Sequence, residues 1–296
     1  MPYHGHQLLP QLRTFLLDTY RRYGRLRNWE PRRLLGHIYH RHPAEASATL
    51  AHLQADWHIW YDANQQIVGA VLCEDAAHQY IQTHPDHHVL VAEMVAWVTS
   101  QRAPHPPSIW CHDDDVHLQQ LLVAHGYTQQ PVHMLQKYCD LRQQHLVPSP
   151  LPAGYHISTM DRTARRGAQM AALLNQAFGR TTHSAAEYAN FQQLMPDYRE
   201  TSDWIVLSPT DDVVCSVGMT WYPEAQLVII EPVATHPAHQ GRGLARAAIT
   251  HGLRIAQQAG LRDAWVEAWH ANAVADHTYT RAGCLTVARH YCWQKQ

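Results

Sequence analysis

The sequence lacks the patterns that would place it in a membrane, outside the cell or on nucleic acid. No apolar run reaches the roughly 20 residues that a membrane-spanning helix needs. The N-terminus, MPYHGHQLLP, lacks the basic and then apolar regions of a signal peptide. The formal net charge is only −2, so the overall charge favours neither nucleic acid nor an anionic membrane as a partner. These absences predict a cytoplasmic protein with no nucleic-acid or membrane partner.

The cysteines lack the spacing of a disulfide framework or a metal cluster. All six stand singly, and no C-x-x-C pair occurs among them. In a chain of 296 residues, this pattern predicts reduced, mostly buried thiols. The positions are Cys73, Cys111, Cys139, Cys215, Cys284 and Cys292.

Zinc motifs are also missing, although the chain contains 25 histidines. An H-x-x-x-H helix with a flanking glutamate does not occur, so the histidines are read as surface or packing residues and no metal is predicted. Metal binding stays the alternative for three local groups: His4/His6, His40/His42 and His84/His87/His88.

The chain contains the same order of elements twice. Asp56–Pro85 and Asp203–Pro237 both start with Asp-Trp, continue through three strand-like runs and end in Thr-His-Pro. Each half then continues with a helix, a short strand and a second helix that ends at a glycine. The proline-rich stretch VPSPLPA interrupts regular structure near the midpoint. This order predicts a tandem duplication, with domains at 1–146 and 154–296 joined by a linker at 147–153.

Hydrophobic periodicity predicts the elements of the second half in most detail. Helices are expected at Arg162–Phe178, Ala185–Leu194, Gly243–Gln258 and Ala273–Ala282. Strands are expected at His156–Met160, Trp204–Leu207, Val213–Trp221, Leu227–Ala234 and Ala264–Ala268, with a last strand pair around Leu285–Tyr291. The first half matches from a helix at Leu8–Tyr23 onward and lacks a clear opening strand.

The stretch QGRGLA, at residues 240–245, follows a strand and opens a helix. The first N–H groups of a helix have no partner inside it, and the macrodipole adds partial positive charge there. Glycines remove the β-carbons that would hold an anion away. A diphosphate is the expected guest, with Arg242 and Arg246 adding charge at its rim. The alternative is a tight turn with no ligand, since neither a complete G-x-G-x-x-G nor a G-K-S/T motif is present.

This loop resembles the pyrophosphate-loop pattern Gln/Arg-x-x-Gly-x-Gly/Ala of the GNAT superfamily of N-acetyltransferases, and the strand ending PVATHP resembles that family's central strand. The resemblance covers the second half and, more weakly, the first. It implies an α+β, three-layer fold: two tandem domains, each a mixed, mostly antiparallel twisted sheet flanked by helices. It implies acetyl-coenzyme A as co-substrate, with the diphosphate on the loop and the pantetheine arm along the strand. The implied binding residues are Val233, Ala234, Thr235, Gln240, Gly241, Arg242, Gly243, Leu244, Ala245, Arg246 and Asn272.

By the same resemblance, Tyr279 donates a proton to the departing thiolate and a backbone N–H near Val233 polarises the carbonyl. Asn272 and Tyr279 are seven residues apart, which places them on one side of a helix. Glu231 is the first candidate for a base acting through water, and Glu267 is the second. The alternatives are a packing tyrosine and solvated strand carboxylates.

The first half departs from the pattern after its Thr-His-Pro. The chain there reads DHHVLVAEMVAWV, without the glycines. Aligning Gly126 with Gly283 puts Leu122 where Tyr279 stands and Asp115 opposite Asn272. We therefore expect a degenerate first domain that keeps the fold and does not bind coenzyme A in the usual way.

The leading interpretation is an enzyme, an acyltransferase that moves an acetyl group to a primary amine of a small molecule. Acceptor-side elements are expected at Ala185–Leu194 and in the loop that follows, which carry Glu187, Tyr188, Asp197, Tyr198 and Glu200. A protein or peptide N-terminal acetyltransferase and a non-catalytic acyl-coenzyme A sensor are the alternatives. The sequence leaves the acceptor and the oligomeric state open, a homodimer included.

Overall fold

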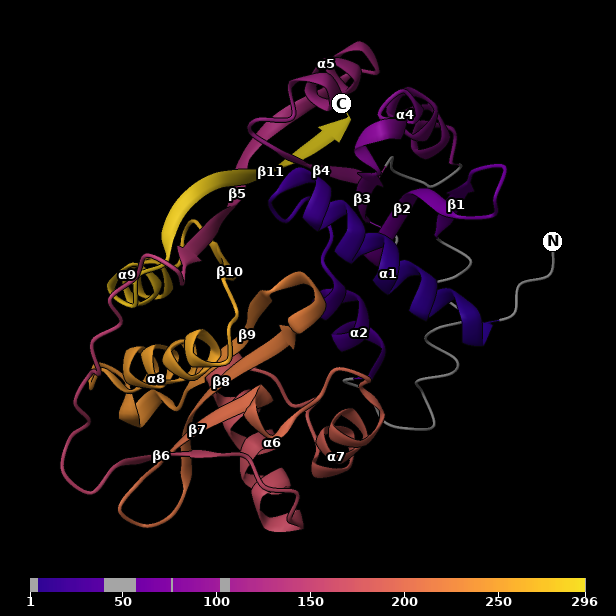
Figure 1. The fold of residues 1–296 in the computed structure, drawn as a ribbon. Coiled ribbons are helices and arrows are strands. Elements are labelled where there is room, and N and C mark those ends of the chain that lie inside the picture. Colours follow the sequence, from indigo (N-terminus) through magenta and orange to yellow (C-terminus); the bar gives the residue numbers. More distant parts are fainter. Residues whose placement is uncertain (1–4, 40–56, 76, 102–106, 296) are drawn as a thin grey trace. The chain divides into compact units, whose positions relative to one another are not determined.

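The structure is a computed structural model that describes residues 5–39, 57–75, 77–101 and 107–295 (Figure 1). His4, His40 and His42, which were named as candidate metal ligands, lie outside these residues. The chain forms two compact units, each described by itself below. The first comprises Met1–Ile38, Ala46–Leu135 and Ala288–Gln296, and the second comprises Tyr39–Glu45 and Gln136–Val287.

The first unit is a sheet in the strand order β1-β2-β3-β4-β11-β5, accompanied by helices. Its elements are α1 (Gly5–Tyr23), α2 (Pro31–Tyr39), β1 (His58–Tyr61), β2 (Ile67–Asp75), β3 (His78–Thr83), α4 (Leu90–Ser100), β4 (Ser108–His112), α5 (Val116–Ala124) and parts of β5 (Tyr127–Asp140) and β11 (Leu285–Lys295). Strands β3 and β4 run parallel, whereas β1–β2, β2–β3 and β4–β11 are antiparallel. The mixed sheet buries apolar residues of α4, Met94, Val95 and Val98 among them, in one core.

The second unit repeats this plan in the strand order β5-β10-β9-β8-β7-β6. Its elements are β6 (His156–Thr159), α6 (Ala164–Phe178), α7 (Ala185–Leu194), β7 (Asp203–Leu207), β8 (Val213–Tyr222), β9 (Leu227–Thr235), α8 (Leu244–Gln258), β10 (Asp263–Trp269) and α9 (Ala273–Arg281). Strands β9 and β10 are parallel, and the pairs from β6 to β9 are antiparallel.

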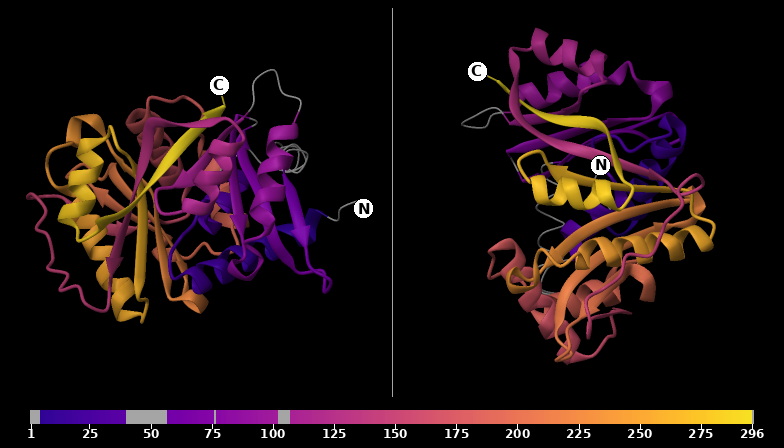
Figure 2. Two further views of the ribbon diagram at one scale, coloured as in Figure 1. Left: turned by 90° about the horizontal axis from the view of Figure 1, so that it is seen from above. Right: turned by 90° about the vertical axis from the view of Figure 1, so that its left-hand side faces the viewer.

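Helices cover both faces of this second sheet, and two neighbouring residues of β7 show which helix lies where. Trp204 packs against α8, where its indole ring lies 4.7 Å from the ring of His251. Asp203 accepts a hydrogen bond from Tyr188 of α7. Because successive strand residues point to opposite faces, α8 covers one face and α7 the other (Figure 2).

The two long strands β5 and β11 each contribute residues to both units. The boundary between the two units lies within β5, between Leu135 and Gln136. The chain from Ala288 onward belongs to the first unit again. The C-terminal strand pairs there with β4, with His290 opposite His112. The units therefore differ from the predicted domains, whose boundary was placed in the proline-rich stretch at 147–153.

The predicted fold class is confirmed: the chain forms α+β units with mixed, mostly antiparallel sheets flanked by helices. The predicted ranges of α6 to α9 each lie within a few residues of the observed ones. Two features were not predicted correctly. Helix α2 was missed, and each half ends in one long strand rather than a strand pair.

All six cysteines are free and buried, as predicted. No helix among the described residues is both long and apolar enough to cross a membrane.

Candidate functional site

A bulge between β8 and β9 shapes the centre of the second sheet. Val217 pairs with Val233, whereas Met219 pairs with Ile230, so one residue of β8 lies opposite two of β9. That one residue is Gly218. A β-carbon at this position would lie 2.2 Å from the carbonyl oxygen of Glu231, a distance that only glycine avoids. A glycine inside a strand marks such close backbone approach, and sequence reasoning passed over this signal.

Beyond the bulge, β9 leaves its parallel neighbour. The ladder between β9 and β10 consists of three pairs, from Leu227–Asp263 to Ile229–Trp265. Both strands continue past it, β9 to Thr235 and β10 to Trp269. Bulges bend a strand and increase its local twist. The segment of β9 that carries Val233, Ala234 and Thr235 therefore lies outside the β10 ladder on that side.

The loop after β9 has the backbone that a bound anion requires. Gly241 and Gly243 adopt positive φ angles of 73° and 75°. Among the described residues, no atom lies within 4 Å of the place that a β-carbon would take at either glycine. Gly243 is also the N-cap of α8, and the helix start has no side-chain cap within the described chain. The first amide groups of α8 thus face open space at the positive end of the helix dipole.

Side chains next to the loop fix its position without filling it. Leu244 is only 2% exposed and belongs to the core of the second unit, and Ala245 packs against the same core. The amide of Gln240 donates to the carbonyl oxygen of Thr235 at 3.3 Å and closes the loop on the end of β9. The loop therefore offers backbone N–H groups while its apolar side chains point inward.

The two arginines of the loop differ in their partners. Arg242 is exposed, and its guanidinium donates to the hydroxyl of Tyr155 at 2.9 Å. The same hydroxyl lies 2.9 Å from Nδ1 of His239. Arg246 is half-buried, and its Nε is buried without a hydrogen-bond partner in the described part of the chain. A buried donor left unpaired costs about 1–3 kcal/mol. Arg246 is thus the better suited of the two to an incoming anion.

Tyr279 lies in α9 and is 7% exposed. Burial raises the pKa of its phenol, and electrostatic interactions with its neighbours, Glu231 among them, raise it further. The hydroxyl therefore keeps its proton at neutral pH. The influence of Glu231 shows that the structure brings the predicted acid and the first candidate for the base into the same neighbourhood. Burial also raises the pKa of Cys215, to about 12, so this thiol stays protonated.

The two candidate carboxylates are placed differently. Glu231 is half-buried and lies at the bulge of β9. Glu267, on β10, accepts a hydrogen bond from the side-chain amide of Gln136 at 3.4 Å. Of the two carboxylates, Glu231 is therefore the one that lies at the bulge.

Asn272 serves as the N-cap of α9. Its side-chain oxygen accepts a hydrogen bond from the backbone of Ala275 at 3.1 Å. Asp115 does the same for Leu118 at the start of α5, at 3.1 Å. The pairing of these two positions between the halves is thus matched by the same capping role. Asn272 has a structural task whether or not it also contacts a cofactor.

Leu122 stands in α5 at the place that corresponds to Tyr279, and it is fully buried. The helix of the first unit that corresponds to α8 is α4. Its N-cap, Val89, has a φ of −61° and no side-chain cap hydrogen bond. The first unit thus shows neither a left-handed glycine at this helix start nor a hydroxyl at the acid position.

The residues predicted on the acceptor side are mostly buried rather than solvated. Glu187 caps α7 and contacts Nδ1 of His183 at 3.0 Å. Tyr188 donates to Asp203, and burial raises the pKa of Tyr188 and of Tyr198. Asp197 is 8% exposed and Glu200 is exposed. Sequence reasoning missed Asp203, whose carboxylate is buried. This residue is the register partner of Gly218 at the bulge.

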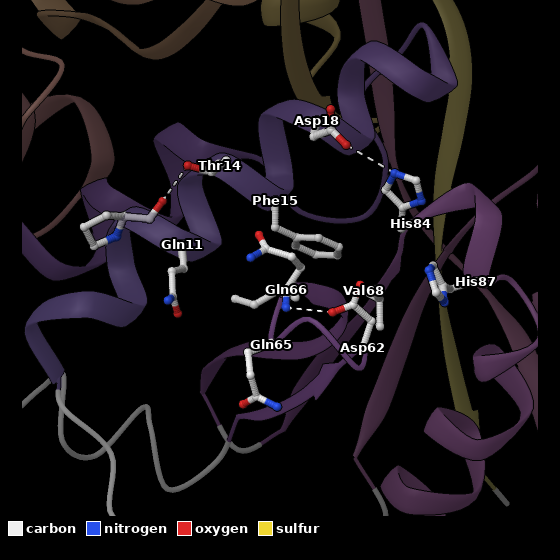
Figure 3. Close-up of a pocket in the computed structure, with 12 residues that line it drawn as sticks. Gln11, Thr14, Phe15, Asp18, Asp62, Gln65, Gln66, Val68, His84 and His87 are labelled. Carbon is white, nitrogen blue, oxygen red and sulfur yellow. Dashed lines mark hydrogen bonds and ion pairs between the residues drawn. The ribbon is translucent and has the colours of Figure 1, made fainter.

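A surface cavity of about 530 Å³ lies in the first unit, between α1, the turn joining β1 to β2, and the end of β3 (Figure 3). Asp18 and Asp62 line it, and Nε2 of His84 lies 3.2 Å from the Asp18 carboxylate. The loop at 240–246 contributes nothing to this cavity.

Comparison with known proteins agrees with this geometry. Residues 168–284 match the model of the acetyltransferase (GNAT) family. The chain is 25% identical over 84 residues to the streptothricin acetyltransferase of Streptomyces lavendulae, a match that covers 28% of this chain and 44% of the relative. The chain therefore spans less than half the length of the curated relative that it matches.

Two solved structures share the fold over nearly the whole chain. One is a GCN5-related N-acetyltransferase from Sphaerobacter thermophilus, with a TM-score of 0.62 and 16% identity, covering 97% of this chain and 92% of that one. The other is a tandem GNAT protein from the clavulanic acid biosynthesis pathway, with a TM-score of 0.64 and 12% identity, covering 99% and 96%. At these identities the likeness concerns the fold alone. The family match thus concerns residues 168–284, and the two solved structures show a similar fold over nearly the whole chain.

Proposed function

We propose that the protein transfers an acetyl group from acetyl-coenzyme A to a primary amine of a small molecule, in its second unit. The observation that carries this proposal is the start of α8. Two left-handed glycines leave its first amide groups facing open space, and the buried Nε of Arg246 lacks a partner among the described residues. A diphosphate would satisfy both at once.

The residues of the site fit the co-substrate from its diphosphate to its thioester. The loop at 240–246 would hold the diphosphate, and the part of β9 from Val233 to Thr235, outside the β10 ladder, would accept the pantetheine arm. Bound acetyl-coenzyme A supplies an acetyl group as a thioester whose leaving group is a thiolate. The protein then has two proton tasks, because the amine must lose a proton and the thiolate benefits from gaining one.

Tyr279 and Glu231 suit these two tasks. The buried hydroxyl of Tyr279 retains its proton at neutral pH, because burial raises its pKa, and it would protonate the thiolate. Glu231 lies at the bulge of β9 and would take up the amine proton through a water molecule. Direct attack of the amine then needs no cysteine, and the raised pKa of the Cys284 thiol, caused by its contact with Cys139 and by burial, agrees with that.

Two observations bear on the class of acceptor. The name of the relative from Streptomyces lavendulae describes a protein that acetylates streptothricin, which favours a small-molecule amine. The carboxylate of Asp203, on the α7 side of the sheet, would favour a cation there.

Binding of the co-substrate is tested with two matched variants of one helix. Arg246 and Arg254 both lie in α8, eight residues apart, and both are half-buried. At 100 times its Kd, acetyl-coenzyme A should stabilise the wild type by about 2.7 kcal/mol in thermal unfolding. Arg246→Gln removes a charged hydrogen bond worth roughly 1.5–3 kcal/mol and should weaken binding about 10–150-fold. Arg254→Gln should change the Kd less than twofold.

Turnover is tested by following free thiol against a panel of amines. Release with small amines supports the proposal. Release only with peptide N-termini would favour a peptide acetyltransferase instead, and binding without any release would favour an acyl-coenzyme A sensor. No stabilisation by acetyl-coenzyme A would refute the proposal at its first step.

A further inference from the structure

A buried lysine in the second unit holds the helix that carries Tyr279. Lys137 stands on β5 and is only 1% exposed. Its ammonium group lies 2.5 Å from the carboxylate of Asp276, and it donates to the hydroxyls of Thr280 at 3.0 Å and Thr286 at 2.9 Å. An ammonium group has three N–H donors, so these contacts use all of them.

The three partners surround the proposed acid along the chain. Asp276 and Thr280 are four residues apart in α9, which places them on one face of the helix. Tyr279 lies between them in sequence and, with Ala275 and Ala282, meets the core of the unit. Thr286 belongs to β11, just after the turn at Gly283. One side chain thus joins the last turns of α9 to the strand that follows.

Such an arrangement is unusual enough to need a reason. Lysine is almost never fully buried unless it is paired, and a buried ion pair is weak evidence for stability, since apolar residues of similar size often serve as well. Asp276 is 40% exposed in its side chain, so the pair lies at the border between core and solvent. An interaction that fixes the position of the helix through directed hydrogen bonds gives the lysine a use that apolar packing does not.

From these contacts we infer that Lys137 is a positioning residue of the reaction: its ammonium group sets the position of α9, and so aims the hydroxyl of Tyr279 at the departing thiolate. This inference rests on the proposed function. Lys137 precedes the linker predicted at 147–153, but it lies on the part of β5 that belongs to the second unit. The strand that begins in the first unit would then contribute to catalysis through its last residues.

The test is a double-mutant cycle between Lys137 and Tyr279. Lys137→Met keeps the length of the side chain and removes the charge with its three hydrogen bonds. We expect kcat for thiol release to fall about 10–100-fold, as a displacement of the acid by up to 1 Å predicts, while the Kd for acetyl-coenzyme A changes less than threefold. In a Tyr279→Phe background the same change should lower kcat less than twofold, because there is no hydroxyl left to position.

Controls separate positioning from a loss of folding. Lys295→Met is the same chemical change at the chain's other lysine and should leave kcat and Kd unchanged. Thr286→Val removes one of the three contacts at nearly constant volume, and it serves in the cycle if Lys137→Met does not fold. A reduction of about 2–10-fold in kcat is expected for Thr286→Val, again only when Tyr279 is present.

The outcomes distinguish this inference from the function on which it rests. If the wild type neither binds acetyl-coenzyme A nor releases thiol, the proposed function fails. If Tyr279→Phe lowers kcat but the effects of the two variants multiply, the proposed function stands and the inference on Lys137 is overturned. If Lys137→Met changes the Kd as much as kcat, its role is structural support of the whole unit, and the inference is overturned as well.

Discussion

Replacing Gly218 by alanine is the sharpest test of the bulge between β8 and β9. The added β-carbon would lie 2.2 Å from the carbonyl oxygen of Glu231 and 2.9 Å from Cδ of Pro232. To reach ordinary contact, β9 must move by about 1 Å away from β8, and overpacking of this kind costs about 1–3 kcal/mol. The moving segment carries Glu231 and leads directly to Val233, so stability and activity should both respond.

The expected magnitudes follow from that displacement. In a unit of this size, 1–3 kcal/mol lowers the unfolding midpoint by roughly 2–10 °C. A misplacement of about 1 Å lowers kcat by about 10²-fold, measured as thiol release with a saturating amine. Thermal unfolding monitored by circular dichroism gives the unfolding midpoint. The loss of turnover should be far larger than the loss of folded protein explains.

Gly167→Ala is the matched control. It lies in α6 of the same unit, where the nearest atom to an added β-carbon, the carbonyl oxygen of Ala185, is 3.6 Å away. Alanine inside a helix is favoured over glycine by about 0.8–1 kcal/mol, so this variant should be as stable as the wild type or slightly more so, with unchanged activity. If Gly218→Ala behaves like this control, the bulge does not set the geometry of the site.

Two further predictions concern the chemistry and the pH response. Tyr279→Phe should lower kcat by about 10²-fold or more, as expected for loss of a general acid, with the Kd for acetyl-coenzyme A unchanged. Glu231→Gln should also lower kcat, and unchanged turnover in both variants would remove their assigned roles. In the first unit, burial lowers the pKa of His112, and burial together with Arg33 lowers the pKa of His290 to about 3. Below about pH 6.5 these histidines are protonated in the unfolded chain but not in the folded chain. Their contribution to the free energy of unfolding is therefore full above pH 6.5 and is lost as the pH falls, by about 2 kcal/mol for His290 between pH 7.5 and 5 and in the same direction for His112. His112→Gln should flatten that dependence in urea unfolding measured at each pH, whereas a slope equal to that of the wild type would contradict the burial argument.

Local patterns predicted those parts of the site that are formed by a continuous stretch of chain. The loop at 240–246 needs only glycines at two positions and an apolar residue, Leu244, to fix the helix start, and all of these stand together in the sequence. The capping roles of Asn272 and Asp115 are local in the same sense, since each acts within three residues. Helix α2, at Pro31–Tyr39, was missed.

Features that depend on pairing between distant segments could not be predicted in this way. The position of β11 beside β4 joins His290 to His112 across most of the chain, and no local pattern encodes such a partner. The assumption that each half closes its own sheet placed the domain boundary at the prolines of 147–153. A strand's alternation tells which of its faces is buried, but not which strand lies next to it.

The contacts of Lys137 give the long strand β5 a task in the second unit. This strand begins in the first unit and ends in the second, where it supplies the ammonium group that binds Asp276 and Thr280. Deleting that strand would leave Asp276 without this cation and α9 without its link to Thr286. On this reasoning the second unit needs the part of β5 that follows Leu135 to position α9.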